Sequence, residues 1–305
     1  MSAPRSSWRS GHEGAVIADL DGKVCVITGA TSGIGKETAR ALAESGATVA
    51  LIGRNLEKAR RTLEELSKTA KHPQRLRYFG ADLADLAQVR KLAETLHHAY
   101  DRIDVLVNNA GAIHSRRHVT ADEFELSFGV NHLAHFLLTG LVLDLVKKAA
   151  PSRIVNLSSG AHLNGHIGFD DLQFARRYSG FAAYSQSKLA NVLFTRELAR
   201  RLAGQDIAVN AVHPGSVQTG FAQNNRSPFQ YLVWLMGPLM LTPKQGADTV
   251  VFAASAPEMQ AVTGEYLYKR QPARMAAEAR DDAVAARLWD VSEKLTGAPF
   301  AAAGI

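Results

Sequence analysis

The chain has 305 residues, of which 46% are hydrophobic and 21% are charged, and its formal net charge is +6. This composition is too apolar for a disordered chain and too evenly mixed for an integral membrane protein, and the scattered basic residues form no stripe that would indicate a nucleic-acid partner. The single cysteine, Cys25, excludes a disulfide framework and a thiolate-based metal site, and it fits a reducing, cytoplasmic location.

The beginning of the chain is polar. Residues 1–14 are rich in Ser and Arg and lead into no apolar core with a cleavage site, so we expect 1–20 to be a flexible arm and not a signal peptide. The longest apolar stretch, 229–241, is shorter than the roughly 18 residues of a membrane-spanning helix and contains Gly237 and Pro238. No transmembrane segment is therefore predicted.

From residue 23 onward, short apolar runs rich in Val, Ile and Leu alternate with longer stretches of helical periodicity. This alternation predicts a parallel sheet with helices on both faces, which is a doubly wound α/β fold of the Rossmann type. No linker divides the series, so 21–305 is expected to form one domain with about seven strands. The expected strands are 23–28, 47–52, 75–80, 103–108, 153–158, 207–213 and 265–268, and the expected helices are 34–44, one after residue 55, 85–100, 120–148 and 180–202.

Three of these helices have recognisable starts. Asn55 is a typical N-cap, and Asp85 with Gln88 resembles a capping arrangement. Thr120 with Glu123 has the spacing of a capping box, so one long helix is expected from there to about residue 148.

The first expected strand ends in a glycine-rich turn, GATSGIG (29–35). Three glycines at this spacing let the backbone turn sharply and approach a pyrophosphate, while the next helix directs unpaired N–H groups and its positive dipole end at the anion. A glycine-rich turn alone is weak support, but the strand before it and the helix after it favour dinucleotide binding. The contacts expected here are Gly29, Thr31, Ser32, Gly33, Ile34 and Gly35.

The spacing TGxxxGIG over 28–35 resembles the short-chain dehydrogenase/reductase family and differs from the GxGxxG of most two-domain dehydrogenases. Three further stretches match that family in the expected order: NNAG at 108–111, YSQSK at 184–188 and HPG at 213–215. The resemblance covers 23–268 and implies an oxidoreductase that binds a nicotinamide nucleotide. It also implies that further cofactor contacts come from Asp82, Leu83, Asn109, Ala110, Gly111, Tyr184, Lys188, Pro214, Gly215, Val217 and Thr219.

The end of the second expected strand indicates which nucleotide fits. An acidic residue there would bond the adenosine ribose hydroxyls, but this chain has Gly53 followed by Arg54. A guanidinium beside a small residue can bind a 2′-phosphate through charge-assisted hydrogen bonds, so NADP(H) is the predicted cofactor. The alternative is that Arg54 is an ordinary surface charge at the start of a helix.

Tyr184 and Lys188 are four residues apart, so on a helix they project from one face. A nearby ammonium is expected to lower the pKa of a phenol from about 10 by stabilising the phenolate, which suits an acid/base catalyst. Ser158 and Ser159 follow a strand and reach the carboxyl edge of the sheet, where a hydroxyl can stabilise charge on a substrate oxygen. By resemblance to the family pattern, Ser159 is the catalytic one.

The family resemblance assigns two asparagines. Asn131 resembles the asparagine that interrupts the long helix and holds a water in a proton relay to the lysine, while Asn108 resembles a structural residue that ties neighbouring strands. Together these residues predict carbonyl reduction or its reverse, with hydride transfer from or to the cofactor and proton transfer at Tyr184. Two alternatives stay open: reduction of a carbon–carbon double bond, and a catalytically silent NADP-binding regulator.

Several stretches resemble the retinol-dehydrogenase-like branch of the family, namely FGVNHLAHF (128–136), RIVNLSSGAH (153–162) and SKLANVLFTRELARRL (187–202). The 25-residue step from Ser159 to Tyr184 is longer than usual for the family and also resembles this branch. The branch implies a small hydrophobic carbonyl or alcohol substrate. The family also implies a homo-oligomer, which nothing in the sequence fixes further.

The segment 216–245 is rich in large apolar side chains and is expected to form a substrate lid. It could equally touch a membrane surface, belong to the core or form an oligomer contact. His132 and His135 lie at helical spacing without a suitable carboxylate, so packing or polar bracing is favoured over metal binding. Cys25 is expected to be buried and unreactive, and Trp289 is expected to anchor the C-terminal helix.

Overall fold

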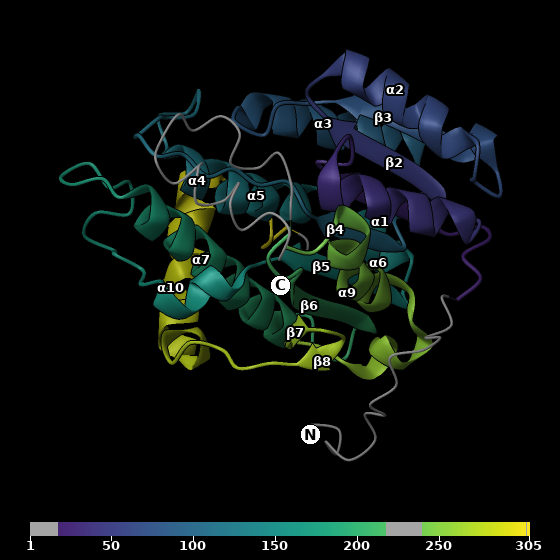
Figure 1. Cartoon of the computed structure of the whole chain (residues 1–305). Helices are drawn as coiled ribbons and strands as arrows, with labels where there is room; N and C mark the ends of the chain where they lie inside the picture. Colours follow the sequence, from purple (N-terminus) through teal and green to yellow (C-terminus); the bar gives the residue numbers. More distant parts are fainter. Residues whose placement is uncertain (1–17, 218–239, 303) are drawn as a thin grey trace.

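The computed structural model describes residues 18–217, 240–302 and 304–305 (Figure 1). Within these residues, eight strands form one sheet in the order β3-β2-β1-β4-β5-β6-β7-β8. All neighbours from β3 to β7 run parallel, and only the two-residue β8 is antiparallel to its neighbour β7. This confirms the doubly wound α/β fold, with one short edge strand beyond the expected seven. The strands are β1 Val24–Thr28, β2 Thr48–Gly53, β3 Leu76–Gly80, β4 Val105–Asn108, β5 Ser152–Leu157, β6 Ile207–His213, β7 Tyr266–Tyr268 and β8 Gln271–Pro272.

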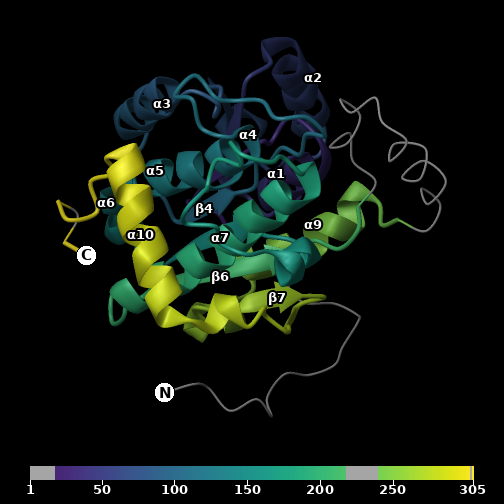
Figure 2. The same cartoon turned by 90° about the vertical axis from the view of Figure 1, so that its left-hand side faces the viewer.

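Helices cover both faces of this sheet (Figures 1 and 2). Side chains alternate along each strand, so Cys25 and Ile27 of β1 pack with α1 and α9, whereas Val26 packs with α3, α5 and α7 on the opposite face. Two apolar layers therefore enclose the sheet, as a parallel sheet requires. The helices are α1 Gly33–Glu44, α2 Leu56–Ser67, α3 Leu86–Ala99, α4 Leu126–Phe128, α5 Ala134–Leu141, α6 Leu143–Lys148, α7 Gly180–Arg201, α9 Pro243–Ser255 and α10 Asp282–Thr296.

Two of the expected helix starts are confirmed. The side chain of Asn55 accepts a hydrogen bond from the amide of Lys58 at the start of α2, at 2.9 Å. Asp85 caps α3 by accepting from the amides of Ala87 and Gln88. Each cap satisfies amides that would otherwise have no partner in the first helical turn.

The expected long helix from Thr120 to about residue 148 is wrong at its start and in its continuity. Thr120 lies in a turn, where its hydroxyl accepts from the amides of Asp122 and Phe124, and Glu123 adopts a positive φ of 65° that cannot continue a helix. The cap is instead Glu125, whose buried carboxylate accepts from two amides at the start of α4. A π-helical turn, η3 (Gly129–Leu133), then separates α4 from α5.

The two ends of the described chain are tied to the body. Leu20 is buried and its amide donates to the carbonyl of Ser45, so the fold begins before residue 21, and the rest of the expected arm lies largely outside the described residues. Near the C-terminus, Trp289 of α10 is 2% exposed and packs against Phe136, Phe194 and Phe300, which confirms its anchoring role. Figure 2 shows α10 lying across the end of the molecule next to α7 and α5.

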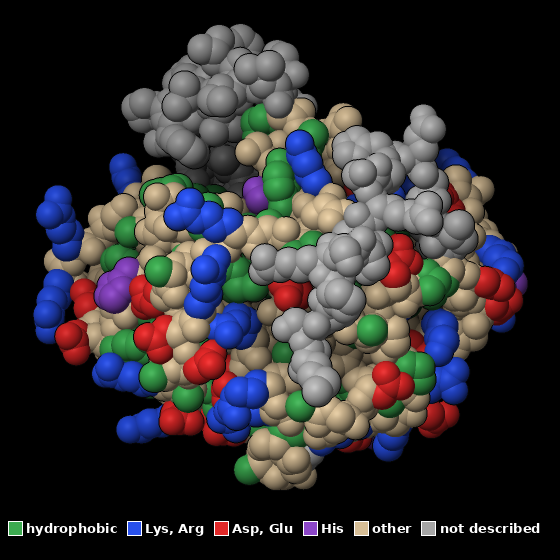
Figure 3. Space-filling model, turned by 90° about the horizontal axis from the view of Figure 1, so that it is seen from below, with side chains coloured by type: hydrophobic (Ala, Val, Ile, Leu, Met, Phe, Trp, Pro, Cys, Tyr) green, Lys and Arg blue, Asp and Glu red, His purple; other side chains and the backbone are tan. Residues whose placement is uncertain are grey.

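The surface carries mixed charge. On the face drawn in Figure 3, Lys and Arg side chains are interspersed with Asp and Glu. Within the described ranges, we find no helix with the length and apolar character needed to cross a bilayer.

Candidate active site

The glycine-rich turn joins the carboxyl end of β1 to α1 and has the backbone that the sequence predicts. Gly29 and Gly33 adopt positive φ values of 65° and 54°, which suit glycine. A side chain on Gly35 would lie 2.4 Å from Nδ2 of Asn109 and 2.5 Å from the carbonyl of Gly29. Ser32 begins α1 without a side-chain cap, and the first turn of α1 contains no acidic residue. The amides of this turn and the positive end of the helix dipole therefore form a cradle that fits a pyrophosphate.

We expect the substitution Gly35→Ala to lower the free energy of unfolding by about 1–3 kcal/mol, because its methyl group must displace backbone of the same turn. Urea unfolding measures this loss. Gly168→Ala is the matched control, since an added methyl there meets nothing nearer than 3.6 Å. Equal stability of the two variants would contradict the tight packing of this turn.

Asn109, at the end of β4, fastens its own turn to the glycine turn. Its Nδ2 donates to the carbonyl of Thr28 at 2.7 Å, and its amide donates to the hydroxyl of Thr28 at 2.9 Å. The amide of Ala110 donates to the same hydroxyl at 2.9 Å. Thr28 therefore holds the two predicted cofactor turns together, a role that the sequence analysis did not assign to it. Neighbouring Asn108 donates to Asn156 of β5 at 2.8 Å, which confirms its expected role as a tie between strands.

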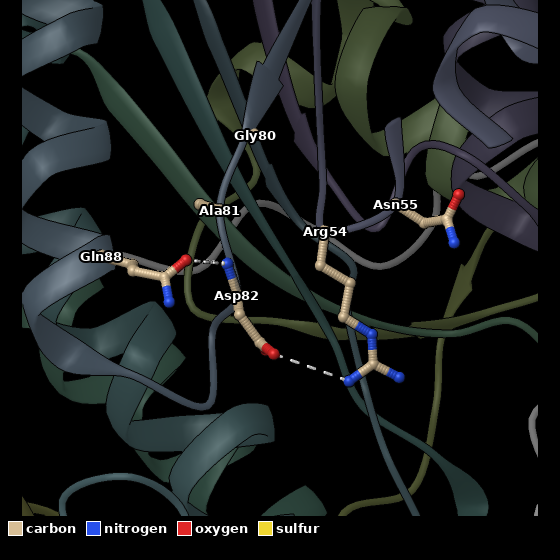
Figure 4. Close-up of a pocket in the computed structure, with 6 residues that line it drawn as sticks. All are labelled: Arg54, Asn55, Gly80, Ala81, Asp82 and Gln88. Carbon is tan, nitrogen blue, oxygen red and sulfur yellow. Dashed lines mark hydrogen bonds and ion pairs between the residues drawn. The ribbon is translucent and has the colours of Figure 1, made fainter. Parts of the chain in front are cut away.

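A hollow of about 380 Å³ lies at the carboxyl ends of β2 and β3 and is drawn in Figure 4. Arg54, 69% exposed, extends over it and lies 3.8 Å from the carboxylate of Asp82. At the neighbouring Gly53, a side chain would lie 3.0 Å from Cγ2 of Thr31, so the glycine turn packs against this position. The structure thus brings Arg54, Asp82 and Thr31 to one edge of the sheet. The lining residues are Arg54, Asn55, Gly80, Ala81, Asp82 and Gln88.

Tyr184 and Lys188 lie one turn apart on α7, and Nζ of Lys188 is 5.7 Å from the centroid of the Tyr184 ring. Lys188 is 4% exposed, and its ammonium donates to the carbonyl of Leu157 at 3.1 Å. Ser159 lies two residues beyond the end of β5 and interacts with the Tyr184 hydroxyl through a hydrogen bond. Ser158 instead donates to the backbone carbonyl of Lys188 at 2.8 Å and braces α7. The structure therefore brings the three predicted catalytic side chains together and separates the two serines by role.

The expected lowering of the Tyr184 pKa is not found. Burial raises the pKa of Tyr184 to about 12, and the hydrogen bond with Ser159 acts in the opposite direction without outweighing it. Burial also lowers the pKa of Lys188 to about 8. Both shifts disfavour the charged form, because Lys188 is buried and Tyr184 is partly buried, so each charge is less well solvated than in water. At neutral pH Tyr184 is therefore a neutral phenol, which is the form that donates a proton.

Asn131 lies within the π-helical turn η3, where the sequence resemblance placed a break in the helix. Its side chain spans two elements: Oδ1 accepts from the amide of Ala112 at 2.6 Å, and Nδ2 donates to the hydroxyl of Ser187 on α7 at 2.9 Å. π-helical turns occur frequently at functional sites. Asn131 thus connects the turn after β4 to the helix that carries Tyr184 and Lys188.

The remaining predicted cofactor contacts lie after the ends of strands or at the start of α1, and one of them, Thr219, lies outside the described residues. Gly215 follows β6 with a φ of 86°, and a side chain there would meet Leu241 at 2.5 Å. Val217 pairs with Leu241 in an isolated bridge, whereas Thr219 and most of the expected lid lie outside the described residues. Leu83 is 6% exposed and belongs to the apolar core. Ile34, Ala110, Gly111 and Pro214 are all partly buried.

The two buried histidines of this region have hydrogen-bond partners. His132 bonds the hydroxyl of Ser292 at 2.8 Å, and His135 bonds the hydroxyl of Thr28 at 2.9 Å. The polar bracing expected from the sequence is confirmed, and the described part of the chain contains no group of three side chains able to hold a metal ion. Burial lowers the pKa of His132 to about 3 and that of His135 to about 4, so both are neutral at physiological pH.

The chain is similar to several known proteins. The family described as short chain dehydrogenase matches residues 23–229. Human retinol dehydrogenase 11 is 44% identical over 92% of this chain and 88% of its own, and human retinol dehydrogenase 13 is 43% identical over 92% and 86%. The crystal structure of an uncharacterized protein from Mycobacterium Paratuberculosis has a TM-score of 0.77 and 36% identity, covering 94% of this chain and 97% of the other. The NADP active-site complex of Pseudomonas aeruginosa RhlG has a TM-score of 0.66 and 26% identity, covering 82% and 95%.

Proposed function

The chain belongs to the short-chain dehydrogenase/reductase family, in its retinol-dehydrogenase-like branch, and on this basis we propose that it is an NADP(H)-dependent oxidoreductase that interconverts a hydrophobic carbonyl compound and its alcohol. The observation that carries the proposal is the meeting of Ser159, Tyr184 and Lys188 at the same edge of the sheet as the glycine cradle. They lie at the carboxyl edge of a parallel sheet, where ligands of such folds bind.

Each side chain has a distinct task in this proposal. The neutral hydroxyl of Tyr184 donates a proton to the carbonyl oxygen as it becomes an alkoxide, and Ser159 hydrogen-bonds the same oxygen. Lys188, held at the carbonyl of Leu157, would bind the nicotinamide ribose. When bound, NADP(H) supplies or accepts the hydride. In alcohol oxidation the step runs in reverse, so Tyr184 must be in its phenolate form to accept the proton, and burial disfavours that form.

The choice of NADP(H) rests on Arg54. Its guanidinium is exposed at the hollow of Figure 4, and its 3.8 Å distance from the Asp82 carboxylate is long for an ion pair. The side chain can therefore reorient toward an added phosphate. Position 53 is a glycine and so carries no carboxylate at the end of β2 that would repel a 2′-phosphate, and the carboxylate that lines the hollow, that of Asp82, lies 3.8 Å from the Arg54 guanidinium. Solved relatives described as NADP complexes, among them a short chain dehydrogenase from Burkholderia cenocepacia, support this choice.

We expect Arg54→Ala to weaken NADPH binding roughly 10- to 100-fold and to leave NADH binding unchanged, because the substitution removes charge-assisted hydrogen bonds to the 2′-phosphate alone. Fluorescence titration with both nucleotides measures the two dissociation constants. Arg60→Ala is the control: Arg60 is also exposed on the following helix and forms an ion pair with Glu57. Equal losses for NADPH and NADH would refute the role of Arg54.

A hydrophobic substrate suits the surroundings of the catalytic helix. Phe181 is 55% exposed and lies one turn before Tyr184, on the neighbouring part of the same helix face. Relatives in this branch carry the name retinol dehydrogenase. The proposal is tested by following NADPH consumption with hydrophobic aldehydes, ketones and enones and by identifying the products by mass spectrometry. Tight NADPH binding without consumption of any compound would favour a regulator, and saturated products from enones alone would favour carbon–carbon double-bond reduction.

A further inference from the structure

One buried histidine near the site has no part in the proposed chemistry. His135 lies on α5, is 2% exposed and is close enough to Lys188 for that ammonium to help lower its pKa. Its Nε2 is 2.9 Å from the hydroxyl of Thr28, and its Nδ1 is 3.1 Å from the backbone carbonyl of Asn131. It therefore lies between the residue that holds the cofactor turns and the residue that holds α7.

The donor in each hydrogen bond between Thr28, His135 and Asn131 follows from counting protons and lone pairs. The hydroxyl of Thr28 has two lone pairs and one proton, and the amides of Asn109 and Ala110 use both lone pairs. Its proton then faces Nε2 of His135 at 2.9 Å or the carbonyl of Val107 at 3.4 Å, and the shorter bond is the better one. Nε2 of His135 is consequently the acceptor, so Nδ1 carries the ring proton and donates it to Asn131.

The other side of Asn131 completes a ring around the turn after β4. The Asn131 side chain bonds both the amide and the carbonyl of Ala112, at 2.6 and 3.0 Å, and also the hydroxyl of Ser187. That hydroxyl donates to the backbone carbonyl of Tyr184 at 2.7 Å. The turn is thus held at Asn109 and Ala110 through Thr28, and at Ala112 through Asn131. His135 links these two attachment points because it hydrogen-bonds both Thr28 and Asn131.

We propose that His135 is a positioning residue that fixes the cofactor turn 109–112 relative to the catalytic helix α7. This inference rests on the proposed function, because it gives His135 a task only where that turn binds the nucleotide and α7 carries the proton donor. The side chain acts through Thr28 and Asn131 and does not contact the reacting atoms in this proposal. Its neutral, singly protonated ring is essential, since only that form accepts at Nε2 while donating at Nδ1.

Two substitutions separate the two bonds. In His135→Asn, the amide nitrogen lies near the position of Nδ1, so the bond to Asn131 is kept and the bond to Thr28 is lost. In His135→Gln, the amide lies near the position of Nε2, so the bond to Thr28 is kept and the bond to Asn131 is lost. We expect His135→Asn to raise the Kd for NADPH about tenfold and to accelerate hydrogen exchange at the amides of Asn109 and Ala110. We expect His135→Gln to lower kcat about tenfold and to change that Kd less than threefold.

His132 provides the matched control. It lies one turn earlier, is 1% exposed and bonds Ser292 of α10, away from the cofactor turns. His132→Asn and His132→Gln are expected to lower Tm while leaving the Kd for NADPH and kcat within twofold of the parent. If the His135 variants change Kd, kcat and amide exchange no more than the His132 variants, the inference is overturned. A nitrogen NMR spectrum that places the His135 proton on Nε2 would overturn it as well.

These readouts are separable from the proposed function. Nucleotide affinity, amide exchange and the tautomer of His135 are measured without turnover. If the Tyr184→Phe variant turns over substrate at the normal rate, the proposed chemistry is refuted and the His135 measurements are unaffected. If Tyr184→Phe abolishes turnover but the His135→Asn variant binds NADPH with normal affinity, the chemistry is supported and the inference is refuted.

Discussion

Tyr184→Phe is expected to lower kcat for carbonyl reduction by about 10²- to 10⁴-fold while leaving NADPH affinity within a few-fold of the parent protein. The substitution removes one oxygen atom and its proton but keeps the ring that packs beside Lys188. The glycine turn and Arg54, which are the proposed contacts to the pyrophosphate and the 2′-phosphate, are untouched. Single-turnover measurement with saturating NADPH isolates the chemical step, and fluorescence titration gives the affinity.

Tyr178→Phe is the control for this substitution. The hydroxyl of Tyr178 donates to the carbonyl of His114 at 3.1 Å and to the carboxylate of Glu125 at 3.2 Å, so it stabilises a loop and has no proposed part in proton transfer. We expect Tyr178→Phe to reduce stability by about 1–3 kcal/mol and to change kcat only a few-fold. Comparable losses of kcat in the two variants would show that the Tyr184 effect is structural and would remove the central residue of the proposed mechanism.

In the chain without a nucleotide, the pKa values of Tyr184 and Lys188 differ from what their spacing suggests. From the four-residue spacing of Tyr184 and Lys188, we expected the ammonium of Lys188 to lower the pKa of Tyr184. In the structure, however, burial raises the pKa of the phenol and lowers that of the ammonium. Spacing along a helix says which residues share a face, but the cost of removing both groups from water depends on everything packed around them.

The fold was predictable because its signals are local. The apolar runs define strands β1 to β7 to within two residues, and Asn55 and Asp85 cap helices where their side chains reach the next amides. The failure at Thr120 has a local cause too, since a Ser or Thr hydroxyl can serve a turn as well as a helix start. The sequence pattern does not distinguish the two uses. The buried Glu125 five residues later determines the outcome by capping α4.

Long-range contacts explain what the sequence analysis missed. Thr28 and His135 are 107 residues apart, and nothing in the spacing of either residue indicates that they share a hydrogen bond. A motif assigned Asn131 to the site, but its partners Ala112 and Ser187 become apparent only when β4 and α7 meet at one edge of the sheet. Residues that act through neighbours are therefore harder to find from sequence than residues that carry a motif.

Acidification is expected to destabilise the protein between about pH 6.5 and pH 4. The pKa values of His132 and His135 are lowered by burial to about 3 and about 4, whereas a histidine in the unfolded chain has a pKa of about 6.5. In this window the unfolded chain binds protons that the folded protein does not bind, so the stability that these two histidines contribute is complete above pH 6.5 and falls as the pH falls. Each such histidine contributes up to about 1.4 kcal/mol per pH unit, so the two together approach about 2.7 kcal/mol per unit.

Urea unfolding at intervals between pH 4.5 and 7.5 measures this slope, and His132→Gln identifies its source. The variant lacks one titrating group, so its slope should be lower by about 1.4 kcal/mol per pH unit even if its stability at pH 7.5 is also lower. The surface carboxylate of Asp21 does not account for this window: Arg75 and His72 lower its pKa to about 2, so that group loses its stabilising effect only at more acidic pH. A stability that is flat from pH 6.5 to 4.5, or a slope unchanged in His132→Gln, would show that these imidazoles gain protons while the protein stays folded.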